Sequence, residues 1–85
     1  MQFPDEVSVD VHRRLRRIEG QIRGIQRLID EGAECGDVVT QLSACRAALD
    51  RVGYKLIAAG MRQCATDPDG DIDAAQLEAL FLKLS

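Results

Sequence analysis

The sequence has no tryptophan, one histidine and two prolines, and aromatic residues make up only 4% of its 85 residues. A short chain with so few large side chains buries only a modest core alone, so we expect a single domain that oligomerises. No apolar run reaches the roughly 18 residues that span a bilayer. The segment from Met1 to Glu6 is acidic, whereas a signal peptide is basic and then apolar. These absences predict a cytoplasmic protein with no membrane partner.

The chain also lacks the residue groupings that enzymes use. It shows no acid and base pair, no nucleophile beside a base and no phosphate-binding loop, so we expect no enzymatic activity. Its three cysteines are an odd number at wide spacing, which is not typical of a secreted disulfide framework. Thiols that stay reduced and serve chemistry are expected instead.

A long helix over residues 35–65 is the central prediction. The stretch contains no proline, and its apolar residues alternate steps of four and three, which is typical of a helix packed along a seam. These residues are Val38, Leu42, Cys45, Leu49, Val52, Leu56 and Ala59. Cys35 and Cys64 then lie on nearly the same face, about 43 Å apart along the axis. They cannot meet within one chain, but antiparallel pairing of two copies places Cys35 of one opposite Cys64 of the other. Cys45 is interpreted as a core residue.

Two further helices are predicted. The first covers residues 9–31 after a mobile arm of residues 1–8, with Asp10 or Ser8 as its N-cap. Its apolar residues repeat in the same way, at Val11, Leu15, Ile18, Ile22, Ile25 and Ile29. The other is a short helix over residues 71–84, with Asp73 as N-cap and Gln76 completing a capping box. Its apolar stripe consists of Leu77, Leu80, Phe81 and Leu84.

Charge is divided unevenly along the chain. The whole chain carries −3, but residues 12–27 alone carry +5, with six arginines against Glu19. On a helical wheel Arg13, Arg16, Arg17, Arg23 and Arg27 face away from the apolar seam, and Arg14 lies on its shoulder. Few acids neutralise this surface, which favours a polyanion such as DNA over a merely solvated face. Arg51, Lys55 and Arg62 of the 35–65 helix extend it.

Together these residues form a pattern that resembles the CsoR/RcnR family of bacterial repressors. The match covers residues 11 to about 84. It rests on Arg14-Leu15-Arg16-Arg17-Ile18-Glu19-Gly20-Gln21-Ile22-Arg23-Gly24-Ile25, Cys35, Gln41-Leu42-Ser43-Ala44 and Cys64. The resemblance implies an all-α fold with three helices per subunit, an antiparallel four-helix-bundle homodimer, a dimer-of-dimers homotetramer and no helix-turn-helix. It also implies binding to operator DNA, with Arg14 and Arg51 as the strongest candidates for contacts. The basic surface itself adds Arg13, Arg17 and Lys55 as further candidates.

The same resemblance implies a sensing site shared across the dimer, made by Cys35 of one subunit and positions 60 and 64 of the other. Copper(I) sensors of the family have Cys, His and Cys there, whereas this chain has Gly60. The single histidine, His12, is expected on the polar side of the first helix. Two cysteines without the histidine resemble the CstR-type, persulfide-sensing branch, which implies no metal cofactor.

On this interpretation, the Cys35 thiolate attacks a persulfide or polysulfide, and Cys64 of the partner then forms an interchain di-, tri- or tetrasulfide link that releases the DNA. The alternative is a copper(I) sensor that uses Cys35 and Cys64, with the thioether of Met61 as an optional third ligand, because copper(I) favours soft sulfur ligands. An alternative of another class is a helical interaction scaffold whose basic face binds an acidic protein.

Overall fold

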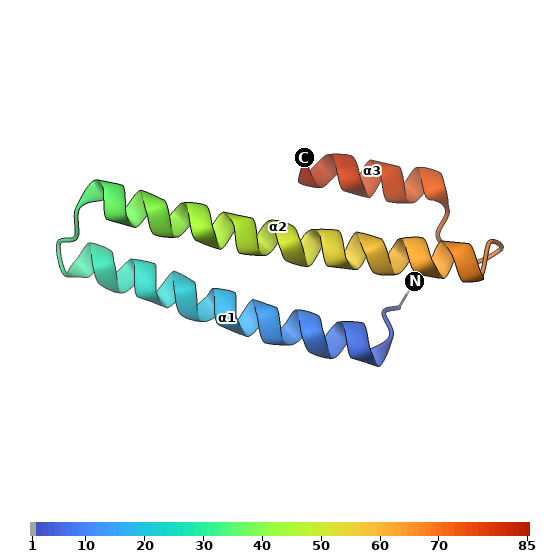
Figure 1. The fold of residues 1–85 in the computed structure, drawn as a ribbon, viewed down its shortest axis with the longest axis horizontal. Coiled ribbons are helices and arrows are strands. Elements are labelled where there is room, and N and C mark those ends of the chain that lie inside the picture. Colours follow the sequence, from blue (N-terminus) through green and yellow to red (C-terminus); the bar gives the residue numbers. More distant parts are fainter. Residues whose placement is uncertain (1) are drawn as a thin grey trace.

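A computed structural model describes residues 2–85, and this part of the chain consists of three helices and no strand (Figure 1). Helices α1 (Asp5–Asp30) and α2 (Cys35–Thr66) form an antiparallel hairpin, and α3 (Ala74–Leu84) folds back along α2 and contacts no other helix. The predicted all-α fold is confirmed. The two long helices lie side by side, unlike the steeply crossed pair of a helix-turn-helix. None of the described helices has the length and apolar character needed to cross a bilayer.

The start of α1 differs from the prediction. The helix begins at Asp5, not at residue 9, so residues 5–8 are helical and not part of a mobile arm. Pro4 occupies the N-cap position, and its carbonyl oxygen accepts hydrogen bonds from the backbone N–H groups of Val7 and Ser8. Asp5 and Glu6 in the first turn complement the positive end of the helix dipole. Ser8 and Asp10 therefore lie inside the helix and do not cap it; Met1, the first residue of the predicted arm, is outside the described residues.

The other helix boundaries agree more closely. Gly32 has a φ of 74°, a left-handed conformation that glycine adopts without steric cost, and it turns the chain from α1 into α2. Helix α2 ends one residue beyond the predicted boundary. Helix α3 begins three residues later than predicted because Asp73 caps it. The predicted capping box is confirmed: the Asp73 carboxylate accepts from the Gln76 backbone N–H, and the Gln76 side chain accepts from that of Asp73.

Only every seventh residue of the apolar repeat is buried within one chain. Val11, Ile18 and Ile25 of α1 pack against Cys45 and Val52 of α2, which confirms that Cys45 is a core residue. Of the intervening residues of the repeat, Leu15, Val38 and Leu56 are partly buried against this core. The other four stay 45–59% exposed: Ile22, Ile29, Leu42 and Leu49. On each helix these positions lie to one side of the buried line, so the hairpin has an apolar flank that nothing in the described chain covers. We call this set of four side chains the apolar flank.

The molecule is a single layer of helices. It measures 54 × 25 × 12 Å, and its radius of gyration of 16.5 Å exceeds the roughly 12 Å of a compact chain of this length. Its accessible surface is 6444 Å², whereas a compact monomer of this mass exposes about 5000 Å². No described side chain is buried to below 2% exposure. The excess surface agrees with the expectation that the chain does not complete its core alone.

Candidate functional site

Cys35 and Cys64 lie at opposite ends of the same helix. Cys35 is the first residue of α2 and is exposed, and Cys64 is half-buried two residues before the helix ends at Thr66. Because α2 is continuous, the two thiols are about 43 Å apart along its axis and cannot share a ligand within one chain. Residues 2–85 also contain no group of three or more His, Cys, Asp or Glu side chains that could hold a metal ion. A two-thiol site therefore requires a second chain.

The two thiols do share a direction. With 100° per residue, Cys35 and Cys64 point about 20° apart around the α2 axis, and both lie within about 60° of Leu42 and Leu49. Those leucines belong to the apolar flank. A second hairpin that covered the flank would approach Cys35 directly. Gly53 and Gly60 point in the same direction as the two thiols and are covered by α3, so the second hairpin would reach Cys64 beside α3.

Position 60, where the resemblance implies a histidine in copper sensors, is filled by the packing of α3. Gly60 is buried, and a Cβ atom placed there would lie 2.6 Å from Cδ2 of Leu77. One heptad earlier, a Cβ atom at Gly53 would lie 2.5 Å from Cδ1 of Leu84. Both distances are shorter than van der Waals contact allows. The two glycines let α3 lie directly against α2, so the missing side chain at position 60 is part of the packing.

Replacing Gly60 by His is expected to loosen α3 and lower the free energy of unfolding by about 1–3 kcal/mol, because an imidazole overpacks the space that Leu77 fills. The measurements are chemical denaturation and hydrogen exchange of the α3 amides. Gly24→His is the matched control, since nothing lies within 4 Å of a Cβ atom there, and histidine has a higher helix propensity than glycine. Unchanged stability and unchanged α3 protection in Gly60→His would contradict this account.

The other soft or imidazole donors are placed differently. Met61 is 59% exposed, and it lines a hollow between α2 and α3 together with Ile57 and Phe81. Its thioether is thus one helical turn from Cys64 on the accessible surface. His12 is exposed on α1, where Asp10, two residues earlier, pairs with Lys55. Lys55 is about 13 Å along α2 from Cys64. The His12 imidazole, on the stretch of α1 that pairs with Lys55, is therefore not beside the Cys64 thiol.

The predicted DNA contacts come together from two helices. A hollow of about 300 Å³ is lined by Arg14 and Arg17 of α1 and by Arg51 of α2. Ala44, Ala47 and Ala48 also line it, and their small side chains do not fill it. Arg14 and Arg51 also border a second hollow with Lys55. We call Arg14, Arg17, Arg51 and Lys55 the basic flank. On the helical wheel it lies on the side of the hairpin opposite to the apolar flank.

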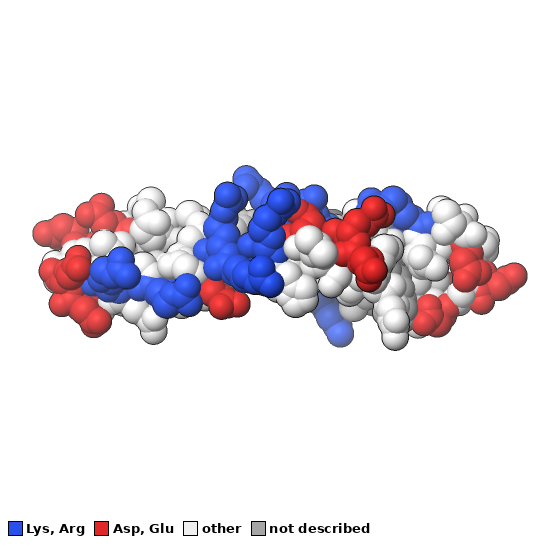
Figure 2. All heavy atoms as spheres, turned by 90° about the horizontal axis from the view of Figure 1, so that it is seen from below, with Lys and Arg blue, Asp and Glu red and all other residues white. Residues whose placement is uncertain are grey.

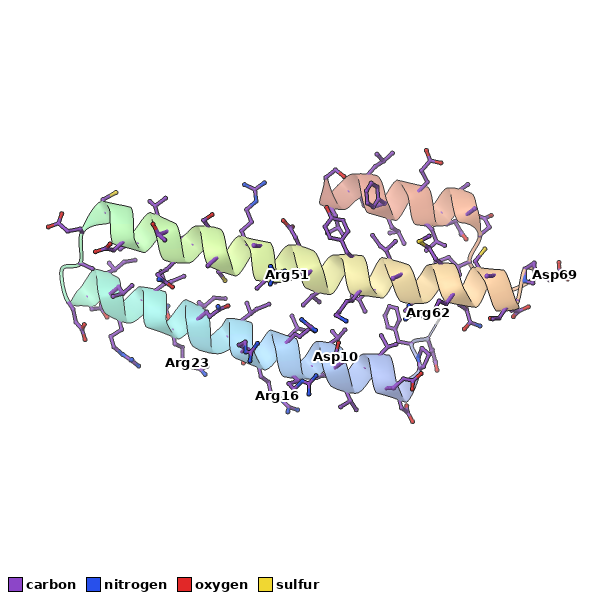
Figure 3. The ribbon with its side chains drawn as sticks, viewed as in Figure 1. Asp10, Arg16, Arg23, Arg51, Arg62 and Asp69 are labelled. Carbon is purple, nitrogen blue, oxygen red and sulfur yellow. The ribbon has the colours of Figure 1, made fainter. Side chains whose placement is uncertain are left out.

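The basic surface continues onto the outer side of α1. Figure 2 shows lysine and arginine side chains gathered at the middle of this face, with acidic side chains directly beside them and toward both ends. Arg16 and Arg23 project from α1 away from α2, and Arg51 lies beside the hairpin groove (Figure 3). The basic residues of the two helices thus cluster in space, and Arg13 lies beside this cluster in contact with Asp10.

Asp10 has a role that its sequence position did not indicate. Its carboxylate is 2.7 Å from Nη2 of Arg13, 3.1 Å from Nε of Arg14 and 3.5 Å from Nζ of Lys55 on the other helix. Hydrogen bonds from Arg14 and then Arg13 lower the pKa of Asp10 to about 2. Since the folded pKa is below the ordinary value, the stabilisation is present above about pH 4 and is lost as the pH falls toward 2. The i,i+3 and i,i+4 spacing to the two arginines was the available signal.

These observations define a class of protein: an all-α chain with a basic flank, an uncovered apolar flank and thiols at the two ends of one helix. The family profile described as "Metal-sensitive transcriptional repressor" matches residues 8–83. The chain belongs to this family of transcriptional repressors, as the resemblance predicted.

Two relatives are similar over most of their length. The copper-sensing transcriptional repressor RicR of Mycobacterium tuberculosis is 40% identical over 78 residues, which cover 85% of this chain and 81% of the relative. The copper-sensing transcriptional repressor CsoR of Bacillus subtilis is 36% identical over 76 residues, which cover 85% of this chain and 75% of the relative. No solved structure matches the chain significantly. Both relatives support the copper alternative better than the persulfide interpretation.

Proposed function

We propose that this chain is a transcriptional repressor that binds operator DNA through its basic flank and is released by copper(I) held between two subunits. The observation that carries the proposal is the placement of Cys35 and Cys64 at the two ends of α2, on the same side as the apolar flank. Copper is proposed as the metal because both relatives are named as copper-sensing repressors. A cytoplasmic location, where thiols stay reduced, belongs to the proposal.

The proposed active form is an antiparallel homodimer. Two hairpins that bury their apolar flanks against each other complete the half-filled seam, and the antiparallel orientation brings Cys35 of each chain to Cys64 of the other. The surface excess of about 1400 Å² over a compact monomer is of the size that a stable pairing of two chains removes. A further pairing of dimers into a homotetramer, as the family resemblance implies, would use surfaces outside this seam.

The donor set fits copper(I). Thiolates and thioethers are soft ligands that select this ion, which would supply a link between the two subunits when bound. Cys35 and Cys64 of the partner would hold it, and the exposed Met61 is the available third sulfur. A link at both ends of the bundle fixes the angle between the two hairpins. Because Arg14 and Arg51 lie on the same hairpins, that angle sets the spacing of the two basic flanks and hence their fit to DNA phosphates.

Persulfide is the second candidate inducer. It is favoured by the absence of a side chain at Gly60, where Cδ2 of Leu77 lies 2.6 Å from the place that a Cβ atom would take. The Cys35 thiolate would attack the sulfane sulfur of a persulfide, release the carrier thiol and become a Cys35 persulfide. The Cys64 thiolate of the partner would then attack its inner sulfur and expel hydrosulfide, which leaves a disulfide; a persulfide on Cys64 as well would leave a trisulfide. The same two residues serve both candidates.

One experiment separates the two inducers. The protein is bound anaerobically to a labelled duplex from the promoter of its own gene, and fluorescence anisotropy is followed while copper(I) or glutathione persulfide is added. We expect release by one copper(I) per subunit, reversal by a copper(I) chelator and no covalent mass change. Release by persulfide alone, with intact masses showing sulfur-linked chain dimers, would replace copper with the second candidate. Release by neither would overturn both.

A further inference from the structure

Asp10 lies where the cations of the two helices converge. The three ion pairs found between side chains of residues 2–85 all involve its carboxylate. Two of the partners, Arg14 and Lys55, belong to the basic flank and come from different helices. Asp10 itself retains 26% exposure, and it borders an open hollow of about 390 Å³ with Lys55 and Arg62 (Figure 3).

The groups that contact this carboxylate are the kinds that also bind phosphate. Its Oδ2 accepts from Nε of Arg14 and is close to Nζ of Lys55, while Oδ1 accepts from Nη2 of Arg13. Guanidinium and ammonium groups bind phosphate oxygens with the same donors that they offer to a carboxylate. A DNA phosphate approaching Arg14 and Lys55 therefore meets cations that already have an anionic partner. Arg17 and Arg51 have no such partner among the described side chains.

We propose that Asp10 is an internal competitor for DNA phosphates, which holds Arg14 and Lys55 in place and at the same time weakens operator binding. The inference rests on the proposed DNA-binding function and names a residue that sets its strength. Its chemical basis is simple: an aspartate carboxylate is anionic at physiological pH, and this one lies within 3.5 Å of three cations. Phosphates must displace it from the two cations or bind beside its negative charge.

The consequence is an affinity for operator DNA that is low enough for the inducer to release the protein. The coupling free energy between two sites in one protein is typically about 1–3 kcal/mol, which corresponds to a change in affinity of about 5- to 150-fold. A repressor that bound its operator much more tightly would stay bound after such a change. A fixed negative charge inside the basic flank lowers the starting affinity without removing any of the cations that recognise DNA.

The test compares Asp10→Asn with Glu19→Gln. Both substitutions remove one negative charge from α1, but Glu19 is exposed and makes no ion pair with the described side chains. Binding to the promoter duplex is measured between 50 and 400 mM salt, on the order of the range in which phosphate contacts are resolved. We expect Asp10→Asn to bind about five- to tenfold more tightly than the parent, with a steeper salt dependence. Glu19→Gln should change affinity less than about twofold.

Asp10→Glu is the second variant, and it keeps the charge. It should bind DNA like the parent, which would show that the effect of Asp10→Asn arises from charge and not from a rearranged helix. Equal or weaker binding of Asp10→Asn, with its helix content and thermal midpoint retained, would overturn the inference and make Asp10 a purely structural residue. The proposed function fails separately, if the parent itself shows no salt-dependent binding to the duplex.

Discussion

Replacing Cys35 by Ser is expected to abolish release from DNA by the inducer and to leave DNA binding as in the parent. The parent should lose affinity by about 100-fold when the inducer is added, equivalent to about 2.7 kcal/mol of coupling. Cys35→Ser should change by less than about twofold, because one of the two sulfur donors at each end of the dimer is gone. Cys64→Ser should behave in the same way. Anisotropy titrations with and without copper(I) measure both quantities.

A mixture of the two variants gives the decisive control. A dimer made of one Cys35→Ser chain and one Cys64→Ser chain retains a complete thiol pair at one end and none at the other. Part of the response should therefore return on mixing, although neither variant responds alone. Absence of any recovery in mixed dimers, verified by differently tagged chains, would contradict a site shared between antiparallel chains. Cys45→Ala is the cysteine control: it removes a buried thiol from the core and should leave the response intact.

Replacing Arg51 by Ala is expected to weaken operator binding by about 10- to 100-fold at physiological salt, because each dimer loses two cations that face phosphates. The slope of log affinity against log salt should become shallower by about one unit for each phosphate that the variant no longer neutralises. Arg51 shares its hollows with Arg14, Arg17 and Lys55, so its removal divides the basic flank. Stability should change little, since the side chain is exposed.

Lys83→Ala is the matched control for this prediction. It removes one positive charge from an exposed position of α3, a helix that contributes no residue to the basic flank or to the apolar flank. Its affinity should stay within about threefold of the parent. Equal reductions in the two variants would mean that overall charge, and not the basic flank, governs binding.

The helices are predictable from the sequence because their signals are local. Steps of four and three residues recur through both long helices, and the seven-residue spacing of Val11, Ile18 and Ile25 is the line that the hairpin buries. Cys45 falls on the equivalent line of α2, which is why its place in the core follows from the repeat alone. The capping box at Asp73 and Gln76 is equally local, since it needs only two residues three apart.

The less predictable features depend on partners that are distant in the sequence. The sequence alone suggests that Asp10 caps a helix. Its ion pair with Lys55 cannot be predicted from local sequence, because Lys55 lies on the other long helix, α2. In the sequence, Gly60 is notable because the position lacks the histidine of the family's copper sensors. Its contact with Leu77 could not be predicted, because it depends on how α3 folds back onto α2. The apolar repeat places the start of α1 too late because Asp5 and Glu6 add no apolar residue to it, although Pro4 marks the boundary. The thiol site remains a prediction, because its second half belongs to another chain.

Because the hairpin is a single layer of helices, its architecture affects how many copies of the repressor a cell must contain. No side chain is fully buried among those described, and the row of Ile22, Ile29, Leu42 and Leu49 is uncovered. A chain of this kind would gain stability from the proposed pairing, and its folded fraction would then follow mass action. Newly synthesised chains at low copy number would spend more time unpaired and open to proteolysis, whereas doubling their number near the dissociation constant would more than double the dimers. Repression would then respond to gene dosage more steeply than in proportion, and the threshold would be set by the apolar flank and not by the DNA-binding residues.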